Sequence, residues 1–146
     1  MQKPNPSQKQ KQLVKWKYSR WLCLSSCFFL LPAYYAYSNK LYFFSVLTSC
    51  TSLISANYWR NPTHSWRRNA DLVFVKLAFF AYLYNYNHVK WMPYIIIGYS
   101  GLAMSLYCYY KANRLFAMKK KSWLKYHIMF HVIIAQLQMI ILYGLL

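Results

Sequence analysis

Residues 126–146 read YHIMFHVIIAQLQMIILYGLL, a predominantly apolar stretch without Asp, Glu, Lys or Arg. A helix needs about 20 such residues to cross the ~30 Å hydrocarbon core of a bilayer. Four further apolar stretches precede it, at residues 21–38, 41–58, 71–84 and 92–110. Together they predict an all-α, polytopic integral membrane protein, with a basic N-terminal arm at residues 1–20 and one bundle of about five transmembrane helices at residues 21–146.

The composition excludes several classes of protein. Lys and Arg number 18 against a single acidic residue, and 58% of the 146 residues are hydrophobic while 13% are charged. Soluble domains are about one-quarter charged, with both signs mixed, so this is not an ordinary soluble domain. The one carboxylate side chain, Asp71, excludes chemistry that needs paired carboxylates. The three glycines form no phosphate-binding loop.

The basic residues predict the orientation of the bundle. Five spans put the arm, the loop at residues 59–70 and the linker at residues 111–125 on one side of the membrane. These segments hold six, three and six of the 18 basic residues, whereas Lys40 and Lys90 fall on the other side and Lys76 within a span. The positive-inside rule therefore predicts an N-terminus on the cytosolic or matrix side. The sequence does not indicate which cellular membrane holds the protein.

The same asymmetry accounts for the net charge of +17. Anionic headgroups attract basic residues near a membrane surface, by about 1 kcal/mol each. We therefore expect membrane lipids with anionic headgroups as partners, other membrane subunits as a further possibility, and no nucleic acid.

His127 and His131 are spaced i, i+4 at the start of the last span, so both rings project from one helix face. This spacing suits two ligands of a zinc ion. The alternative is an interfacial pair of histidines in an aromatic belt with Trp123 and Tyr126. Haem binding is a weaker hypothesis, because two histidines one turn apart cannot bind the iron from opposite faces of one haem.

The predicted topology puts His64 and Asp71 at the same end of the bundle as the histidine pair. Three histidines could hold zinc with one position open for water, whose pKa zinc lowers toward ~7. Asp71 is predicted to open the third span as an N-terminal cap, where the helix dipole favours negative charge. From there its carboxylate could orient or deprotonate the water.

These residues form motifs with a family resemblance. The stretch from Ser55 to Trp59 reads SANYW, Asp71 follows twelve residues after Trp59, and the last span begins with a His-x-x-x-His at His127 and His131. The pattern resembles the superfamily of alkaline ceramidases, progestin/adiponectin receptors and haemolysin-III-like proteins. That family's first motif is Ser-x-x-x-His with an Asp about a dozen residues on. Here Trp59 stands in place of its histidine.

The resemblance implies a membrane-embedded, zinc-dependent amide hydrolase or a relative of one. It assigns zinc to His127 and His131, with His64 as a substitute for the missing ligand, and it gives catalytic roles to Asp71 and Ser55. The family usually has about seven helices, two more than predicted here.

Three arginines accompany tryptophans in the loop between the second and third spans: Arg60, Arg67 and Arg68, beside Trp59 and Trp66. Guanidinium groups bind phosphate through paired hydrogen bonds, which predicts a clamp for lipid headgroups. The alternative is an interfacial belt of aromatic and basic residues.

Two functions remain open from the sequence. The first is a metal-dependent, hydrolase-like protein acting on a lipid amide or ester at the inner membrane face. The second is a non-catalytic accessory subunit of a larger membrane complex, respiratory or viral, which packs against partner helices and binds anionic lipid.

Overall fold

The computed structural model describes residues 12–146, and this part of the chain is helical without strands. Its elements are α1 (Trp16–Ser26), the 3-10 segment η1 (Cys27–Phe29), α2 (Leu30–Ser38), α3 (Tyr42–Arg60), α4 (Trp66–Tyr86), α5 (Met92–Ala117) and α6 (Trp123–Gly144). Because α1, η1 and α2 follow one another without a break, they form one kinked rod. The predicted all-α bundle of five rods is confirmed for the described residues, and residues 1–11 of the predicted arm lie outside them.

The kink in the first rod has a covalent cause. Pro32 lies in the first turn of α2, and η1 directly precedes that helix. Proline has no N–H to donate to the carbonyl four residues earlier, so the preceding turn is free to tighten into a 3-10 conformation.

The helix α1 begins at Trp16, in the last residues of the predicted arm. The start of α4 differs from the sequence prediction. The helix α4 begins at Trp66 with Ser65 as its N-cap, so the prediction that Asp71 caps this helix is wrong. Hydropathy detects the apolar part of a helix, whereas residues 66–70 form a polar first turn that precedes it. Asp71 consequently lies inside α4, only 9% exposed.

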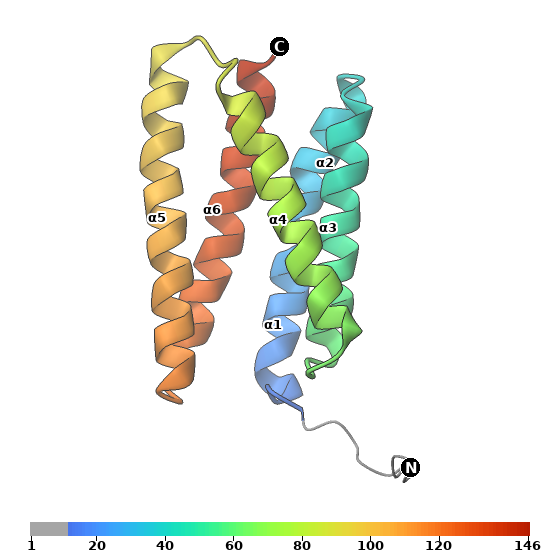
Figure 1. The fold of residues 1–146 in the computed structure, drawn as a ribbon, viewed down its shortest axis with the longest axis vertical. Helices are drawn as coiled ribbons and strands as arrows, with labels where there is room; N and C mark the ends of the chain where they lie inside the picture. Colours follow the sequence, from blue (N-terminus) through green and yellow to red (C-terminus); the bar gives the residue numbers. More distant parts are fainter. Residues whose placement is uncertain (1–11) are drawn as a thin grey trace, which may run out of the picture.

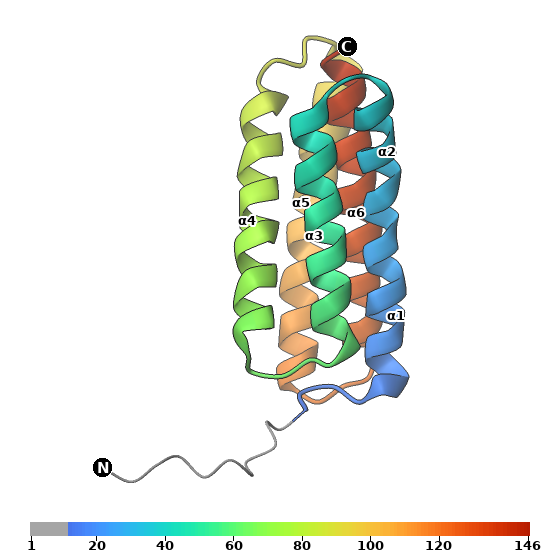
Figure 2. The ribbon, with the colours of Figure 1, turned by 90° about the vertical axis from the view of Figure 1, so that its right-hand side faces the viewer.

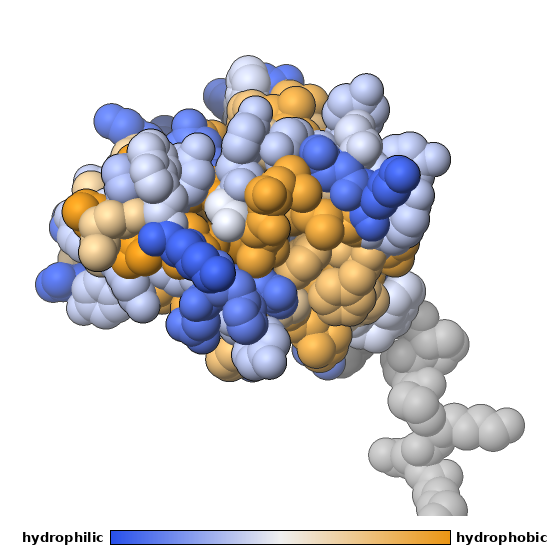
Figure 3. Space-filling view, turned by 90° about the horizontal axis from the view of Figure 1, so that it is seen from above, coloured by the Kyte–Doolittle hydropathy of each residue, from blue (hydrophilic) through white to orange (hydrophobic). Residues whose placement is uncertain are grey.

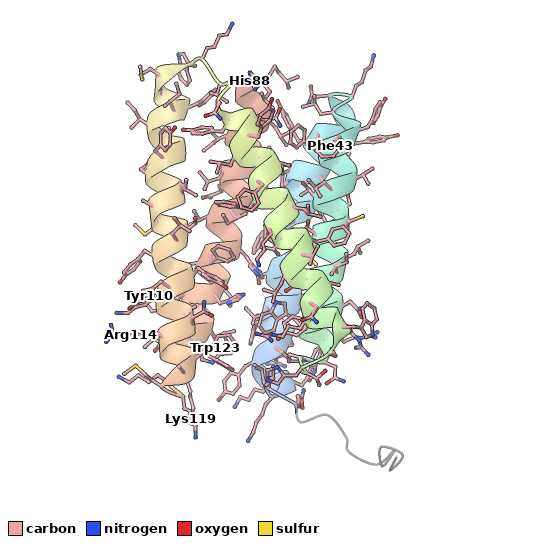
Figure 4. All side chains as sticks on the ribbon, in the orientation of Figure 1. Phe43, His88, Tyr110, Arg114, Lys119 and Trp123 are labelled. Atoms are coloured by element: carbon pink, nitrogen blue, oxygen red, sulfur yellow. The ribbon has the colours of Figure 1, made fainter. Side chains whose placement is uncertain are left out.

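The rods run side by side along the long axis of the molecule (Figures 1 and 2). The start of α1 and the connections at residues 61–65 and 118–122 lie at one end, here called the N-terminal end. The connections at residues 39–41 and 87–91 and the C-terminus lie at the other, the C-terminal end. Figure 4 shows His88 and Phe43 near the latter and Arg114, Lys119 and Trp123 near the former.

Most of the described basic residues gather at the N-terminal end, as the charge pattern predicts. The C-terminal end, seen in Figure 3, carries hydrophilic residues around apolar ones. The basic residues of the N-terminal end are Lys15, Lys17, Arg20, Arg60, Arg67, Arg68, Lys111, Arg114, Lys119, Lys120, Lys121 and Lys125.

Many small polar side chains are buried, and many large apolar ones are exposed. Ser26 Oγ and Ser55 Oγ share a hydrogen bond (3.2 Å), and Ser52 Oγ donates to the Ser26 carbonyl (2.8 Å), so hydroxyls join α1 to α3. In contrast, Leu31 and Leu53 are 64% and 65% exposed. By length and apolar composition, α6 is the helix of the described residues that qualifies as a membrane span.

The helices α4 and α5 stay apart over most of their length. The helix α4 packs on α3 and touches α6, while α5 packs on α6. Near the C-terminal end Tyr86 of α4 reaches α5, where its hydroxyl donates to the Ile95 carbonyl. Gly98 leaves the room for that phenol, because a Cβ at this position would overlap the Tyr86 ring.

We expect Gly98→Ala to lower the free energy of unfolding by about 1–3 kcal/mol, the usual cost of overpacking a filled site. Gly101→Ala is the matched control, because its Cβ would meet a methyl of the flexible Leu137 side chain, which can move aside. Both changes gain the same helix propensity. Denaturant unfolding in detergent measures the difference, and equal stabilities of the two variants would show that Tyr86 is not held in place.

Candidate functional site

A cavity of about 690 Å³ opens in the N-terminal half of the bundle, and α3, α4, α5 and α6 all contribute to its walls. Ser55 lines it from α3, Asp71 from α4, and His127 and His131 from α6. His64 reaches it from the connection between α3 and α4. The five residues predicted to bind metal or act in catalysis thus lie around one cavity.

The two histidines of α6 lie against each other in this cavity. Their ring centroids are 4.9 Å apart and their planes meet at 73°. His131 is buried, and its Nδ1 lies 2.8 Å from Ser25 Oγ of α1. His127 is half-buried. The edge of one imidazole therefore faces the plane of the other.

Trp59 covers His127 from the α3 side. It is buried, one turn beyond Ser55, and its ring centroid lies 5.1 Å from that of His127. Trp123 packs on the same group, 6.4 Å from Trp59 and 6.2 Å from His127 between centroids. The indole of Trp59 therefore occupies the space next to the histidine pair that a shorter side chain on α3 would leave open.

Asp71 is a buried carboxylate with an unused oxygen. Its Oδ1 has no hydrogen-bond partner among residues 12–146. Burial of a polar atom without a partner costs about 1–3 kcal/mol. This oxygen therefore lowers the stability of the fold, and its presence is better explained by a chemical role. Lys76, one and a half turns further along α4, lines the same cavity.

The three predicted headgroup-binding arginines are not brought together at the cavity. Arg68 lines it, whereas Arg60 and Arg67 do not belong to its walls. Arg68 also lines a small surface pocket with His64. Arg68 and Lys76 therefore supply the positive charge around the cavity, and the sequence alone did not assign Lys76 to the site.

An apolar recess continues from the cavity toward the C-terminal end. Ser55 and His131 belong to the walls of both, together with Val75, Phe79, Phe130 and Ile134. The recess, of about 100 Å³, extends to Tyr86 and Gly98, where α4 meets α5. Both spaces therefore have largely apolar walls, and the histidines and Asp71 line the larger of the two.

The side chains around the cavity are of the types that bind zinc, but in the structure they do not lie close enough together to form a metal site. Two imidazoles one turn apart and a carboxylate with a free oxygen are the ligand types of catalytic zinc. Yet no three His, Cys, Asp or Glu side chains of the described range are close enough to form a metal-binding group.

No protein-family model, curated protein or solved structure matches the chain. The resemblance to the ceramidase and progestin/adiponectin receptor superfamily thus depends on Ser55, Asp71, His127 and His131. The contact between Ser25 and His131 lay beyond sequence reasoning, because 106 positions separate the two residues.

Proposed function

We propose that the chain is a polytopic membrane protein whose bundle crosses the bilayer with its N-terminal end on the cytosolic or matrix side. The distribution of side chains supports this proposal. Buried Ser and Thr residues permit close helix packing in a membrane, and an outer surface rich in exposed Leu, Ile, Phe and Tyr suits contact with lipid. The concentration of Lys and Arg at the N-terminal end supports the orientation.

Cysteine labelling in sealed vesicles tests the orientation. The vesicles keep the cytosolic or matrix face of the membrane inside. In a chain whose four native cysteines are replaced by serine, we expect Lys90→Cys to react with an impermeant maleimide added to the outside of these vesicles. Lys121→Cys, at the other end, should react only after detergent opens the vesicles. Labelling of both positions from outside would contradict a spanning bundle.

Within this bundle, the cavity is proposed to serve a metal-dependent, hydrolase-like activity on a lipid amide or ester. One observation carries this proposal: the polar side chains of the histidine pair, Asp71 and Ser55 gather in a largely apolar cavity that continues into an apolar recess. A lipid amide or ester likewise joins a small polar group to a long apolar chain. Its acyl chain fits the recess lined by Phe79 and Ile134, and its amide or ester group then lies beside the polar residues.

Each polar residue has a role in this proposal. His127 and His131, with His64, would hold the zinc ion, which when bound would polarise the substrate carbonyl and activate water. Asp71 would serve as the general base, since its Oδ1 has no hydrogen-bond partner among residues 12–146. Ser55 donates a hydrogen bond to the reacting group. Arg68 and Lys76 attract an anionic headgroup.

Release of fatty acid from a labelled lipid amide or ester in nanodiscs tests the activity. We expect the parent chain to exceed empty nanodiscs and Ser55→Ala to be slower by about tenfold, the loss of one hydrogen bond worth ~1.4 kcal/mol. Ser38→Ala is the control, because Ser38 is exposed at the far end and bonds only its own helix. No release by the parent would favour the accessory-subunit alternative.

A further inference from the structure

The hydroxyl of Ser25 has two close neighbours in the interior of the bundle. It donates to the Leu22 carbonyl at 3.0 Å within its own helix and lies 2.8 Å from His131 Nδ1. Ser25 is 3% exposed and His131 is 4% exposed, so water does not compete for these bonds.

The count of hydrogens determines which ring nitrogen of His131 carries a proton. A serine hydroxyl has one hydrogen to donate and lone pairs to accept with, and a carbonyl can only accept. If Ser25 donates to Leu22, His131 must donate its Nδ1–H to Ser25 Oγ, and both contacts are bonds. If Ser25 donates to His131 instead, its oxygen and the Leu22 oxygen lie 3.0 Å apart without a hydrogen between them. The first arrangement satisfies both contacts.

No other described neighbour of the His131 ring forms a hydrogen bond with it, so Ser25 determines which ring nitrogen carries the proton. Phe29, His127 and Phe130 face the ring with centroids at 5.4, 4.9 and 5.9 Å. These contacts are aromatic, and Ser25 is the hydrogen-bond partner that the structure gives His131 within residues 12–146. Because Nδ1 is engaged with α1, Nε2 is the nitrogen left for the cavity that His131 lines.

We propose that Ser25 is a positioning residue that holds neutral His131 in its Nδ1–H tautomer and so presents an unprotonated Nε2 to the cavity. A nitrogen with a free lone pair can bind a metal or accept a proton, whereas a protonated one can do neither. Histidines that bind metals commonly donate their other ring N–H in this way. The benefit for zinc rests on the proposed function, but the tautomer does not.

Nitrogen NMR of ¹⁵N-histidine-labelled, metal-free protein in detergent tests the proposal, with the His131 signals assigned from a His131→Gln variant. The parent should show a protonated Nδ1 and an unprotonated Nε2. In Ser25→Ala we expect the Nε2–H tautomer to become populated, while Ser25→Thr retains the parent signals. Ser26→Ala is the matched control, because Ser26 also bonds the Leu22 carbonyl but contacts Ser55 instead of His131.

Zinc affinity separates this inference from the proposed function. If zinc binds, Ser25→Ala should weaken its affinity by about 10–100-fold, as loss of a supporting hydrogen bond does elsewhere. An Nδ1–H tautomer that depends on Ser25 without any zinc binding would support the inference and contradict the metal site. A parent with Nε2 protonated, or a Ser26→Ala change as large as that of Ser25→Ala, would overturn the inference.

Discussion

Trp59→His should raise the affinity of the chain for zinc by about 100-fold, or ~2.7 kcal/mol. Trp59 extends from α3 toward His127, with 5.1 Å between the ring centroids, and it occupies the position at which the resembling family has a histidine. An imidazole there would lie beside two others. Three histidines complete the ligand set of many catalytic zinc sites.

Competition with a chromophoric chelator measures this gain in affinity. Trp59→Phe is the control, since it also removes indole volume but introduces no ligand. Because Trp59 is buried, both variants should be less stable than the parent, and by similar amounts. An affinity that is equal in Trp59→His and Trp59→Phe would mean that α3 does not direct position 59 at the metal.

Asp71→Asn should abolish most of the proposed hydrolysis and at the same time stabilise the protein. General base catalysis contributes about 10²–10⁴-fold to a rate, so we expect a loss of at least about 100-fold. Burial of an amide costs less than burial of an ionised carboxylate one oxygen of which has no partner. The free energy of unfolding should therefore rise, by about 1 kcal/mol.

Release of labelled fatty acid and denaturant unfolding, measured on the same preparation, check both effects of this change. Asp71→Glu is the matched control, because it keeps a carboxylate and should retain part of the rate. A variant Asp71→Asn that is less stable than the parent would show that the carboxylate serves the fold. Full activity of that variant would remove Asp71 from the mechanism.

The fold could be predicted where apolar length decides it. The five rods and the sorting of the connections follow from hydropathy and from the asymmetry of Lys and Arg. The start of α4 at Trp66 and the extension of α5 to Ala117 could not be found in this way, because these turns are polar. Asp71 was therefore expected at a helix start and lies inside α4 instead.

The candidate site was predictable where motif spacing places residues on one end of the bundle. The histidine pair was chosen by spacing, His64 and Asp71 by the predicted topology, and Ser55 by the family resemblance, and all five line one cavity. The contact of Trp59 with His127 and the bond of Ser25 to His131 depend on how α1, α3 and α6 pack, which no local pattern encodes. The same packing places Arg68, but not Arg60 or Arg67, in the wall of the cavity.

The zinc content of the purified protein tests the proposed metal site most directly. Elemental mass spectrometry of the detergent-purified chain should find close to one zinc ion per chain, beside a His127→Ala, His131→Ala double variant that holds none. A thermal unfolding measurement on both proteins checks that the double variant is folded. Absence of zinc from the parent after incubation with zinc and mild washing would contradict the metal-dependent site.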